Sequence, residues 1–473
     1  MMNTVFSKSL LLCFCAWAPL NAASEIDVFK TDRNVSNTAI KEIDKTTGSC
    51  EVDSVPALLT LEAFIERVLC HDPQVRHAWA DAKLQAAMVG VRQSAYLPRL
   101  NGSSGITSGY NEMTYEKEGE YSRHGHQHQL ENRLDLSWVL FDFGRREAAL
   151  QNARQLLVAA NANQDRRLQE TFLMAANLYY EALALQGRQI ATTKITALAA
   201  ENLKAAEAKY AAGVAALSDR LQAQTAYSQA RLNEIRSSGA LRNTQGLIAL
   251  RMGLQPQTSL ELAGNLSRRP DIQFNNGVDD LLHQARRDHP SLIAAKAKVN
   301  AAKAAIGESQ AAGRPTVSFI ATFSEVKTNQ PMEYNGDLRV RDNSVGLQLN
   351  IPFFEGFERT YHKRGAQAQL EARESELADV EQRISSELWT NFQTLTIETR
   401  SLERTAEWVE QSNQALRVVQ GRYNSGVGNM IELLSSLSAY AAAEQQHIDA
   451  LSNWQLARLR LASNLGSLGF WTL

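Results

Sequence analysis

The chain has 473 residues, of which 44% are hydrophobic and 21% charged, and its formal net charge is -2 at pH 7. This near-neutral balance gives no support for nucleic acid or for a strongly charged substrate as a partner. A chain of this length would ordinarily form about three globular domains, yet no Pro/Gly/Ser-rich linker or change in composition divides it that way.

The N-terminus has the pattern of a secretory signal peptide. Lys8 precedes an apolar stretch from Leu10 to Ala18, and small residues follow at Ala22 and Ala23. The apolar stretch is too short for a membrane-spanning helix, which needs about 20 residues. We therefore predict a signal peptide over 1–23, cleaved after Ala22 or Ala23, and a mature chain outside the cytoplasm.

A polar segment over 24–56 follows, and Cys50 and Cys70 are the two cysteines outside the signal peptide. In an oxidising compartment they have only each other to pair with. We expect a Cys50–Cys70 disulfide that ties the polar segment to the following helix, with two unpaired thiols as the alternative.

Four segments alternate apolar and polar residues with the period of a β-strand, at about 99–112, 129–142, 315–327 and 343–354. No stretch of the mature chain has 18 successive apolar residues, so any membrane insertion would be by strands. The alternation fits a half-buried sheet in water as well as strands in lipid. Polar segments within each pair, Asn111–Gln129 and Lys327–Asp342, favour lipid-spanning hairpins with outward loops.

Aromatic residues gather at one end of these strands like an interfacial girdle, although packing in a core is the alternative: Trp138, Phe141, Phe143, Phe353, Phe354 and Phe357. Three alternating histidines, His124, His126 and His128, are expected in the first outward loop. They are weak candidates for binding copper, nickel or zinc, and a solvated loop is the alternative. No nucleophile motif, P-loop or zinc-protease motif is present, so we predict neither an enzyme nor a cofactor.

Two very long helices are predicted, from Gly144 to Gly213 and from Gly356 to Gly426, each about 100 Å in length. Apolar residues in the second step by seven with one shift of four, which predicts left-handed supercoiling with a local unwinding: Leu370, Leu377, Ile384, Leu388, Leu395, Leu402, Val409, Leu416 and Tyr423. Shorter helices are predicted over 58–97, 218–252, 278–312 and 430–464. So long and thin a chain is expected to form an obligate oligomer.

The sequence contains an internal duplication. Pro73, Gly90 and Pro98 recur as Pro290, Gly307 and Pro315, each 217 residues later, and Tyr210, Gly213 and Gly253 recur as Tyr423, Gly426 and Gly466, each 213 later. Two repeats of this length indicate two equivalent halves of one assembly rather than solenoid modules. We place the first repeat at 57–255, a linker at 256–277, the second repeat at 278–468 and a tail at 469–473.

The order of helix, strand pair, very long helix, tight turn and helix, performed twice, resembles the TolC-like outer-membrane channel family over almost the whole mature chain. The match is carried by Arg422-Tyr423-Asn424-Ser425-Gly426-Val427 leading to Glu432, and by Lys209-Tyr210-Ala211-Ala212-Gly213-Val214 leading to Asp219. Each motif alone is weakly specific, and the duplicated architecture makes the resemblance strong.

The resemblance implies an α+β membrane protein of the Gram-negative cell outer membrane. Each protomer of a homotrimer would give four strands to a shared 12-stranded β-barrel, continued by a long periplasmic α-helical barrel. Family members are passive conduits recruited by a periplasmic adaptor protein and an inner-membrane ABC transporter or other pump. Because strands in lipid must satisfy every backbone group, two hairpins per chain cannot close without partner copies.

By resemblance, Gly213, Val214, Gly426 and Val427 would form the adaptor-docking tips. Asp219 and Glu432, with Tyr210 and Tyr423, would form the periplasmic gate, where trimeric carboxylate rings favour cations. The alternative for Asp219 is a residue that stabilises a helix N-terminus, with Ser218 as N-cap. Gly428 stands where the best-known members have a gate-locking arginine, and Ser435 replaces a second acidic residue, so a lock built on that arginine is in doubt.

Within the family, the Cys50/Cys70 pair and the short C-terminus are similar to members that serve type I secretion of large adhesins or RTX proteins. The function predicted is therefore the outer-membrane component of a type I secretion system. The alternatives are a multidrug or metal efflux channel and, from another class, a soluble periplasmic coiled-coil scaffold or adaptor.

Overall fold

The computed structural model describes residues 27–36, 58–115, 121–264, 278–329, 337–466 and 468. The predicted signal peptide and Cys50 lie outside these ranges. The described chain divides into two compact units. The first, here called the sheet unit, contains 82–157 and 300–370 with a short N-terminal piece, and the second, the helical unit, contains 36–81, 158–299 and 371–473.

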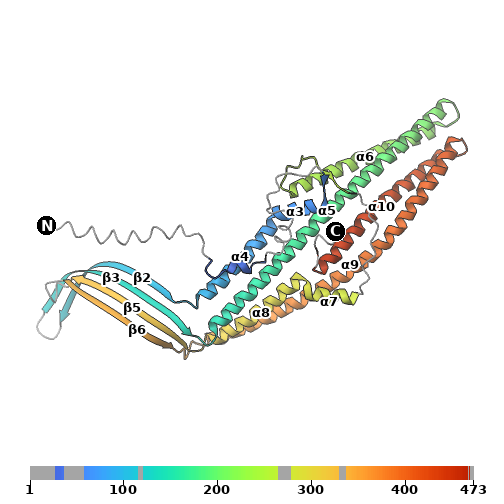
Figure 1. The fold of residues 1–473 in the computed structure, drawn as a ribbon. Coiled ribbons are helices and arrows are strands. Elements are labelled where there is room, and N and C mark those ends of the chain that lie inside the picture. The colour runs from blue at the N-terminus through green and yellow to red at the C-terminus, as the bar shows by residue number, and fades with distance from the viewer. Residues whose placement is uncertain are drawn as a thin grey trace, which may run out of the picture. The chain divides into compact units, whose positions relative to one another are not determined.

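The sheet unit contains one antiparallel sheet in the order β2-β3-β5-β6 (Figure 1). Its strands are β2 (Arg99–Tyr115), β3 (Tyr121–Phe141), β5 (Thr316–Asn329) and β6 (Asp337–Asn350). The pairing of β3 with β5 joins a hairpin from each repeat into a single sheet. Much of the two predicted polar loops is strand, so the prediction of loops at Asn111–Gln129 and Lys327–Asp342 was wrong. From Tyr121 to Gln129 nearly every residue of β3 is polar, and in β5 and β6 the apolar residues change face near the loop, with Val326 and Val340 on the face opposite Phe323. The alternation used to recognise a strand is therefore interrupted near both loops.

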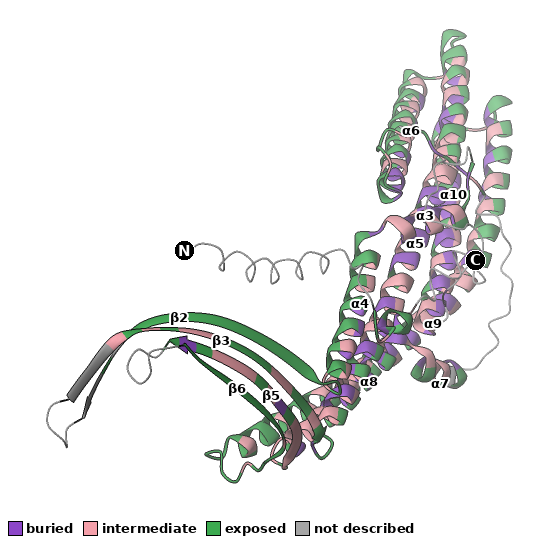
Figure 2. Ribbon diagram, turned by 60° about the vertical axis from the view of Figure 1, so that its left-hand side comes forward, coloured by how far each residue is buried: buried purple, intermediate pink, exposed green. Residues whose placement is uncertain are grey.

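The sheet has one apolar and one polar face. Register places Leu134, Leu136 and Trp138 of β3 opposite Phe323, Ala321 and Phe319 of β5, and directly paired residues share a face. The intervening residues form the polar face, where Arg133 pairs with Asp135 at 2.8 Å and Thr322 donates to the same carboxylate at 2.8 Å. Most sheet residues are exposed in this chain (Figure 2). Trp138 and Phe354 are 41% and 75% exposed, so the aromatic cluster is not core packing within one chain.

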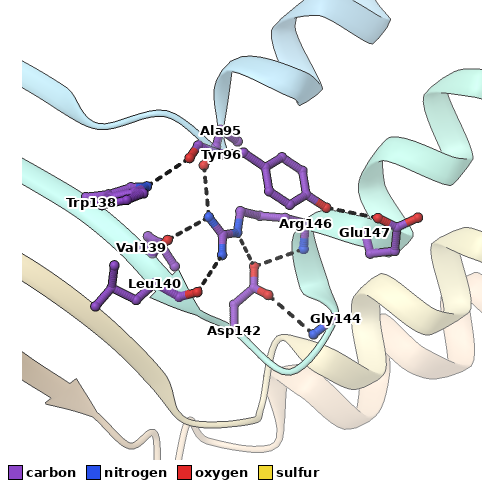
Figure 3. A network of polar contacts seen from close by, with 9 residues as sticks. All are labelled: Ala95, Tyr96, Trp138, Val139, Leu140, Asp142, Gly144, Arg146 and Glu147. Atoms are coloured by element: carbon purple, nitrogen blue, oxygen red, sulfur yellow. Dashed lines mark hydrogen bonds and ion pairs between the residues drawn. The ribbon is translucent and has the colours of Figure 1, made fainter.

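The passage from β3 into the first long helix is held by a buried ion pair (Figure 3). Asp142 accepts from the backbone N–H of Gly144 and Arg146, and it pairs with the Arg146 guanidinium at 2.9 Å. The same guanidinium donates to the carbonyl oxygens of Ala95, Val139 and Leu140 at 3.3, 2.7 and 3.3 Å. Gly144 has φ +90°, a conformation that favours glycine. The arginine thus ties the end of β3 to the chain that precedes β2.

Helices α5 (Arg145–Ala211) and α9 (Glu358–Asn424) each have 67 residues, as the proline-free, alanine-rich sequence predicts. Each turns back into a 35-residue helix, α6 (Leu217–Arg251) and α10 (Met430–Asn464). Along α9 the seven-residue stripe is buried at Ile384, Leu388, Leu395, Leu402, Leu416 and Tyr423. The stripe therefore faces packed neighbours, as its spacing indicates.

The shorter helices correct two predictions, because each predicted helix is broken at a proline. The first is α3 (Leu61–His71) followed by α4 (Pro73–Ser94), and the second is α7 (Val278–Asp288) followed by α8 (Pro290–Ala311). Asp72 Oδ1 accepts from Gln74 N at 2.7 Å, and His289 Nδ1 accepts from Ser291 N at 3.1 Å. Proline is favoured at the first position of a helix, where its missing N–H costs nothing. Each proline therefore starts a new helix.

The helical unit holds the cores. One surrounds Phe64 and Tyr179, whose hydroxyl donates to the Leu59 carbonyl oxygen at 2.8 Å. That carbonyl lies in β1 (Leu58–Leu59), which pairs in parallel with β4 (Glu261–Leu262). A second core contains Leu388 and Trp454, and a third joins α5, α6, α9 and α10. The first described element is the 3₁₀ turn η1 (Thr31–Asn34). Among the described helices, none has an apolar stretch long enough to cross a membrane.

Candidate functional site at the helical hairpin tips

The two hairpin turns that the motifs single out have the same backbone geometry. In the first, Gly213 N donates to Tyr210 O at 2.9 Å and Val214 N to Lys209 O at 3.0 Å. In the second, Gly426 N donates to Tyr423 O and Val427 N to Arg422 O, both at 3.0 Å. The glycines have φ +74° and +81°, which this type of helix C-cap requires. Val214 and Val427 are 74% and 70% exposed, so each turn presents an apolar side chain to its surroundings.

The second hairpin is closed by its own side chains. Asn429 caps α10, with its Oδ1 accepting from Glu432 N at 2.7 Å. The Glu432 carboxylate then pairs with Arg422 of α9 at 2.7 Å. Because Arg422 and Glu432 lie on opposite arms of the turn, this ion pair links the two helices at their ends.

Among the described residues, the first hairpin has neither a side-chain N-cap nor an ion pair between its two arms. The N-cap of α6 is Ala216, which has no side-chain hydrogen bond, and Ser218 is already inside the helix. The interpretation of Ser218 as N-cap was therefore wrong, because α6 begins at Leu217. Asp219 is half-buried in the first turn of α6, where its charge complements the helix dipole.

Lys209 connects the two hairpins. It occupies the position equivalent to Arg422, 213 residues earlier, but its Nζ donates to the backbone oxygen of Tyr423 in α9. The same ammonium lies 4.0 Å from the centre of the Tyr423 ring, which adds a cation–π interaction. The equivalent cations of the two repeats therefore have different partners. Arg422 pairs with Glu432 of its own hairpin, and Lys209 contacts Tyr423 of the neighbouring hairpin.

The two tyrosines that the resemblance predicts for the gate also differ. Tyr423 is only 2% exposed, and its hydroxyl has no hydrogen-bond partner. Burial raises the pKa of Tyr423, and the negative charge of nearby Asp219 raises it further. Tyr210 is 38% exposed, with the Arg220 guanidinium 5.2 Å from its ring centre. The structure therefore brings Tyr423, Asp219 and Lys209 together, and it leaves Tyr210 at the surface.

The backbone around position 428 leaves no room for a side chain. A Cβ added there would lie 2.9 Å from the backbone nitrogen of Tyr423 and 3.2 Å from the carbonyl carbon of Arg422. Real Cβ atoms essentially never approach backbone closer than 3.0 Å. An arginine at this position would displace the turn, so the arginine lock has no place here.

Sequence reasoning missed Lys209, Arg422 and Asn429 as site residues. The repeat offset of 213 residues could have identified Lys209 and Arg422, because it aligns these two cations at the same distance before their turn glycines. The remaining predicted residues stand apart from the tips. Cys70 lies on α3 and is disulfide-bonded, but Cys50 is outside the described residues, so the pairing stays a prediction.

His124, His126 and His128 lie in β3 and not in a loop, which corrects their predicted setting. His126 packs edge-on against Tyr110 with ring centres 5.5 Å apart. Among the residues whose side chains the structure describes, no group of three His, Cys, Asp or Glu could hold a metal ion. The His124 side chain is outside that set, so metal binding there remains untested.

The same fold occurs in known channels. The chain matches the outer-membrane channel OprN with a TM-score of 0.74 at 19% identity, covering 87% of this chain and 91% of that one. It matches CusC with a TM-score of 0.72 at 16% identity, covering 86% and 92%. These similarities show the fold.

Sequence comparison extends the likeness. Protein CyaE of Bordetella pertussis is 28% identical over 422 residues, which is 89% of this chain and 86% of the relative. The outer membrane efflux protein BepC of Brucella suis is 23% identical, covering 86% of each, and the outer membrane protein TolC of Escherichia coli is 20% identical, covering 84% and 80%.

The profile of the outer membrane efflux protein family matches residues 64–253 and 281–467. The two matched segments correspond to the two repeats and together make up most of the chain, which confirms the TolC-like resemblance. The soluble scaffold alternative is therefore set aside. This chain is a protein of the cell outer membrane and belongs to the outer membrane efflux protein family.

Proposed function

We propose that the chain is a passive export duct, a homotrimer whose protomers each give four strands to a 12-stranded outer-membrane barrel continued by a periplasmic helical barrel. The observation that carries this proposal is the four-stranded sheet with one apolar face. Within it β2 and β6 each have a single neighbour, so both edges present unpaired backbone groups. Unpaired backbone groups are costly in lipid, and closure with two further copies removes them.

The hairpin tips are proposed as the periplasmic entrance. The exposed Val214 and Val427 beside the glycine turns would contact a periplasmic adaptor protein, and Asp219 and Glu432 would each form a ring of three carboxylates. Such rings favour cations in a narrow pore. The tip contacts described above support this reading, because they hold the helix ends of both hairpins together.

The carboxylate rings predict cation selectivity. In a planar bilayer with a salt gradient, the wild-type channel should show a reversal potential displaced toward that of the cation. Changing both Asp219 and Glu432 to alanine should abolish the displacement, and the freed Arg422 should shift it toward anions. Glu201→Ala, which removes an exposed carboxylate elsewhere on α5, serves as the matched control. Unchanged selectivity in the double variant would remove these residues from the entrance.

Type I protein secretion is the export system we propose, through an inner-membrane ABC transporter. The chain is 28% identical to Protein CyaE, against 22–23% to BepC, SepC and TtgF, the relatives whose names contain the word efflux. The predicted Cys50–Cys70 pair adds support. Multidrug or metal efflux remains the second candidate, favoured by the family name.

Deletion of the gene distinguishes the two systems. Loss of the surface display or secretion of a large protein, with unchanged resistance to toxic compounds, is the result expected for type I secretion. Unchanged protein secretion together with heightened sensitivity to drugs or metal ions would assign the chain to efflux. Complementation with the wild-type gene controls for effects on neighbouring genes.

A further inference from the structure

The apolar face of the sheet ends in a cluster of cations. On β5 the apolar residues stop at Phe323, and Glu325 and Lys327 follow at the next two positions on the same face. On β6, Arg341 and Arg339 are paired with Glu325 and Lys327 respectively, which places all four side chains together. We call these four residues the strand cation cluster.

In this cluster one carboxylate forms ion pairs with three cations. Glu325 lies 2.6 Å from Arg339, 3.2 Å from Arg341 and 3.4 Å from Lys327. The side chains of Arg339, Arg341 and Lys327 are 50%, 61% and 48% exposed, whereas that of Glu325 is 25% exposed. The cluster therefore keeps two uncompensated positive charges and directs them outward.

A hollow of about 540 Å³ lies beside the cluster. Its lining includes apolar Leu134 and Phe323, the amides of Asn132 and Asn343, and the charged Glu325 and Arg341. Register puts these six residues on the apolar face. A ligand in this hollow would thus meet hydrocarbon on one side and hydrogen-bond donors with positive charge on the other.

The position of the cluster matches a membrane boundary. Leu349 and Arg341 are eight residues apart on β6, which is about 26 Å along the strand and about 20 Å of height at a barrel tilt of about 40°, and an outer-membrane apolar band is about 25 Å tall. Exposed Phe353 continues the apolar surface on the helix side. The cluster lies toward the β5–β6 connection, away from the start of α9, and in the proposed orientation this is the outer leaflet.

We infer that the strand cation cluster and its hollow bind the phosphorylated glucosamine headgroup of an outer-leaflet glycolipid of the lipid A type. Guanidinium groups bind phosphate oxygens through paired, charge-assisted hydrogen bonds, and basic pockets on membrane proteins select lipids with phosphorylated headgroups. The adjoining Phe323 and Leu134 contact the acyl chains. The inference rests on the proposed function only for the orientation of the sheet, since charge and shape come from the cluster itself.

The test measures lipid A retained by the purified, full-length protein after exchange into detergent and readdition of defined lipids. Wild-type protein should retain bis-phosphorylated lipid A at least about tenfold more than dephosphorylated lipid A, because the lost contacts are charge-assisted. Arg339→Gln combined with Arg341→Gln should lose that preference. Arg99→Gln, the same change on the polar face of the same sheet and outside the lining of the hollow, should keep it.

Glu325→Gln supplies a change of the opposite sign. It removes the carboxylate that competes with phosphate, so retention of bis-phosphorylated lipid A should rise. Equal retention of the two lipids by wild-type protein, or a preference for phosphatidylglycerol over lipid A, would overturn the inference. The bilayer recording separates the two proposals, because a conducting channel without phosphate-dependent retention rejects the lipid site alone, and retention without conductance rejects the duct alone.

Discussion

Lys209→Met is expected to raise the open probability of the channel roughly 5–30-fold in planar bilayers at fixed voltage. Lys209 makes the hydrogen bond and the ring contact that join α5 to Tyr423 of α9. A charged hydrogen bond to a carbonyl together with a partly exposed cation–π contact is worth about 1–2 kcal/mol. If opening separates the two hairpins, that free energy is lost from the closed state and the equilibrium moves by the corresponding factor.

Two variants make this prediction specific. Lys204→Met removes an exposed lysine from the same helix and should leave gating unchanged. Tyr423→Phe should also leave it unchanged, because the hydroxyl has no hydrogen-bond partner and the ring remains in place. A Tyr423→Phe channel that opens as readily as Lys209→Met would show that the hydroxyl, and not the lysine, holds the tips closed.

Arg146→Ala is expected to have the largest effect on stability, with a loss of about 3 kcal/mol or more for the sheet unit. Arg146 and Asp142 have side chains only 14% and 10% exposed, so the substitution leaves a buried carboxylate without its cation. It also removes the donor to three carbonyl oxygens at the end of β3 and before β2 (Figure 3). The measurement is the denaturation midpoint, followed by tryptophan fluorescence, to which Trp138 contributes; its Nε1 donates to Tyr96 O at 2.8 Å in the same network.

Neighbouring arginines provide the comparison. Arg145→Ala changes an exposed residue one position earlier and should not move the midpoint. Arg359→Ala removes the equivalent arginine of the second repeat, whose pair with Glu355 is 37% and 36% exposed, and should cost no more than about 1 kcal/mol. Similar losses for Arg145 and Arg146 would show that charge alone, rather than the buried network, stabilises the junction.

Features that depend on local composition were predictable. The ends of α5 and α9 follow from the turn glycines, and the buried stripe of α9 follows from its spacing of seven. Pro73 and Pro290 were recognised as repeated positions, yet the predicted helices ran through them. Proline is tolerated at the first position of a helix, and whether it opens a new one depends on Asp72 or His289 accepting the next free N–H.

Features that depend on distant contacts were not predictable from one sequence. Lys209 and Tyr423 are 214 residues apart, and their contact requires the packing of both hairpins. The polar ends of β2 and β3, including His126 and His128, carry no apolar alternation, so nothing local marks them as strand. The difference between the two tips could not be predicted for the same reason. Lys209 and Arg422 occupy equivalent positions in the two repeats, and only the folded structure shows that Lys209 contacts Tyr423 whereas Arg422 pairs with Glu432.

The tight fit at Gly428 also limits which side chains the second hairpin turn can accept. Because a Cβ there would lie 2.9 Å from backbone, a mutation to arginine would first have to push the second hairpin turn apart. Gly428 N donates to Arg422 O at 3.1 Å, so the backbone before α10 lies directly against the last turn of α9. Any side chain at this position would therefore widen the second tip and lengthen that hydrogen bond.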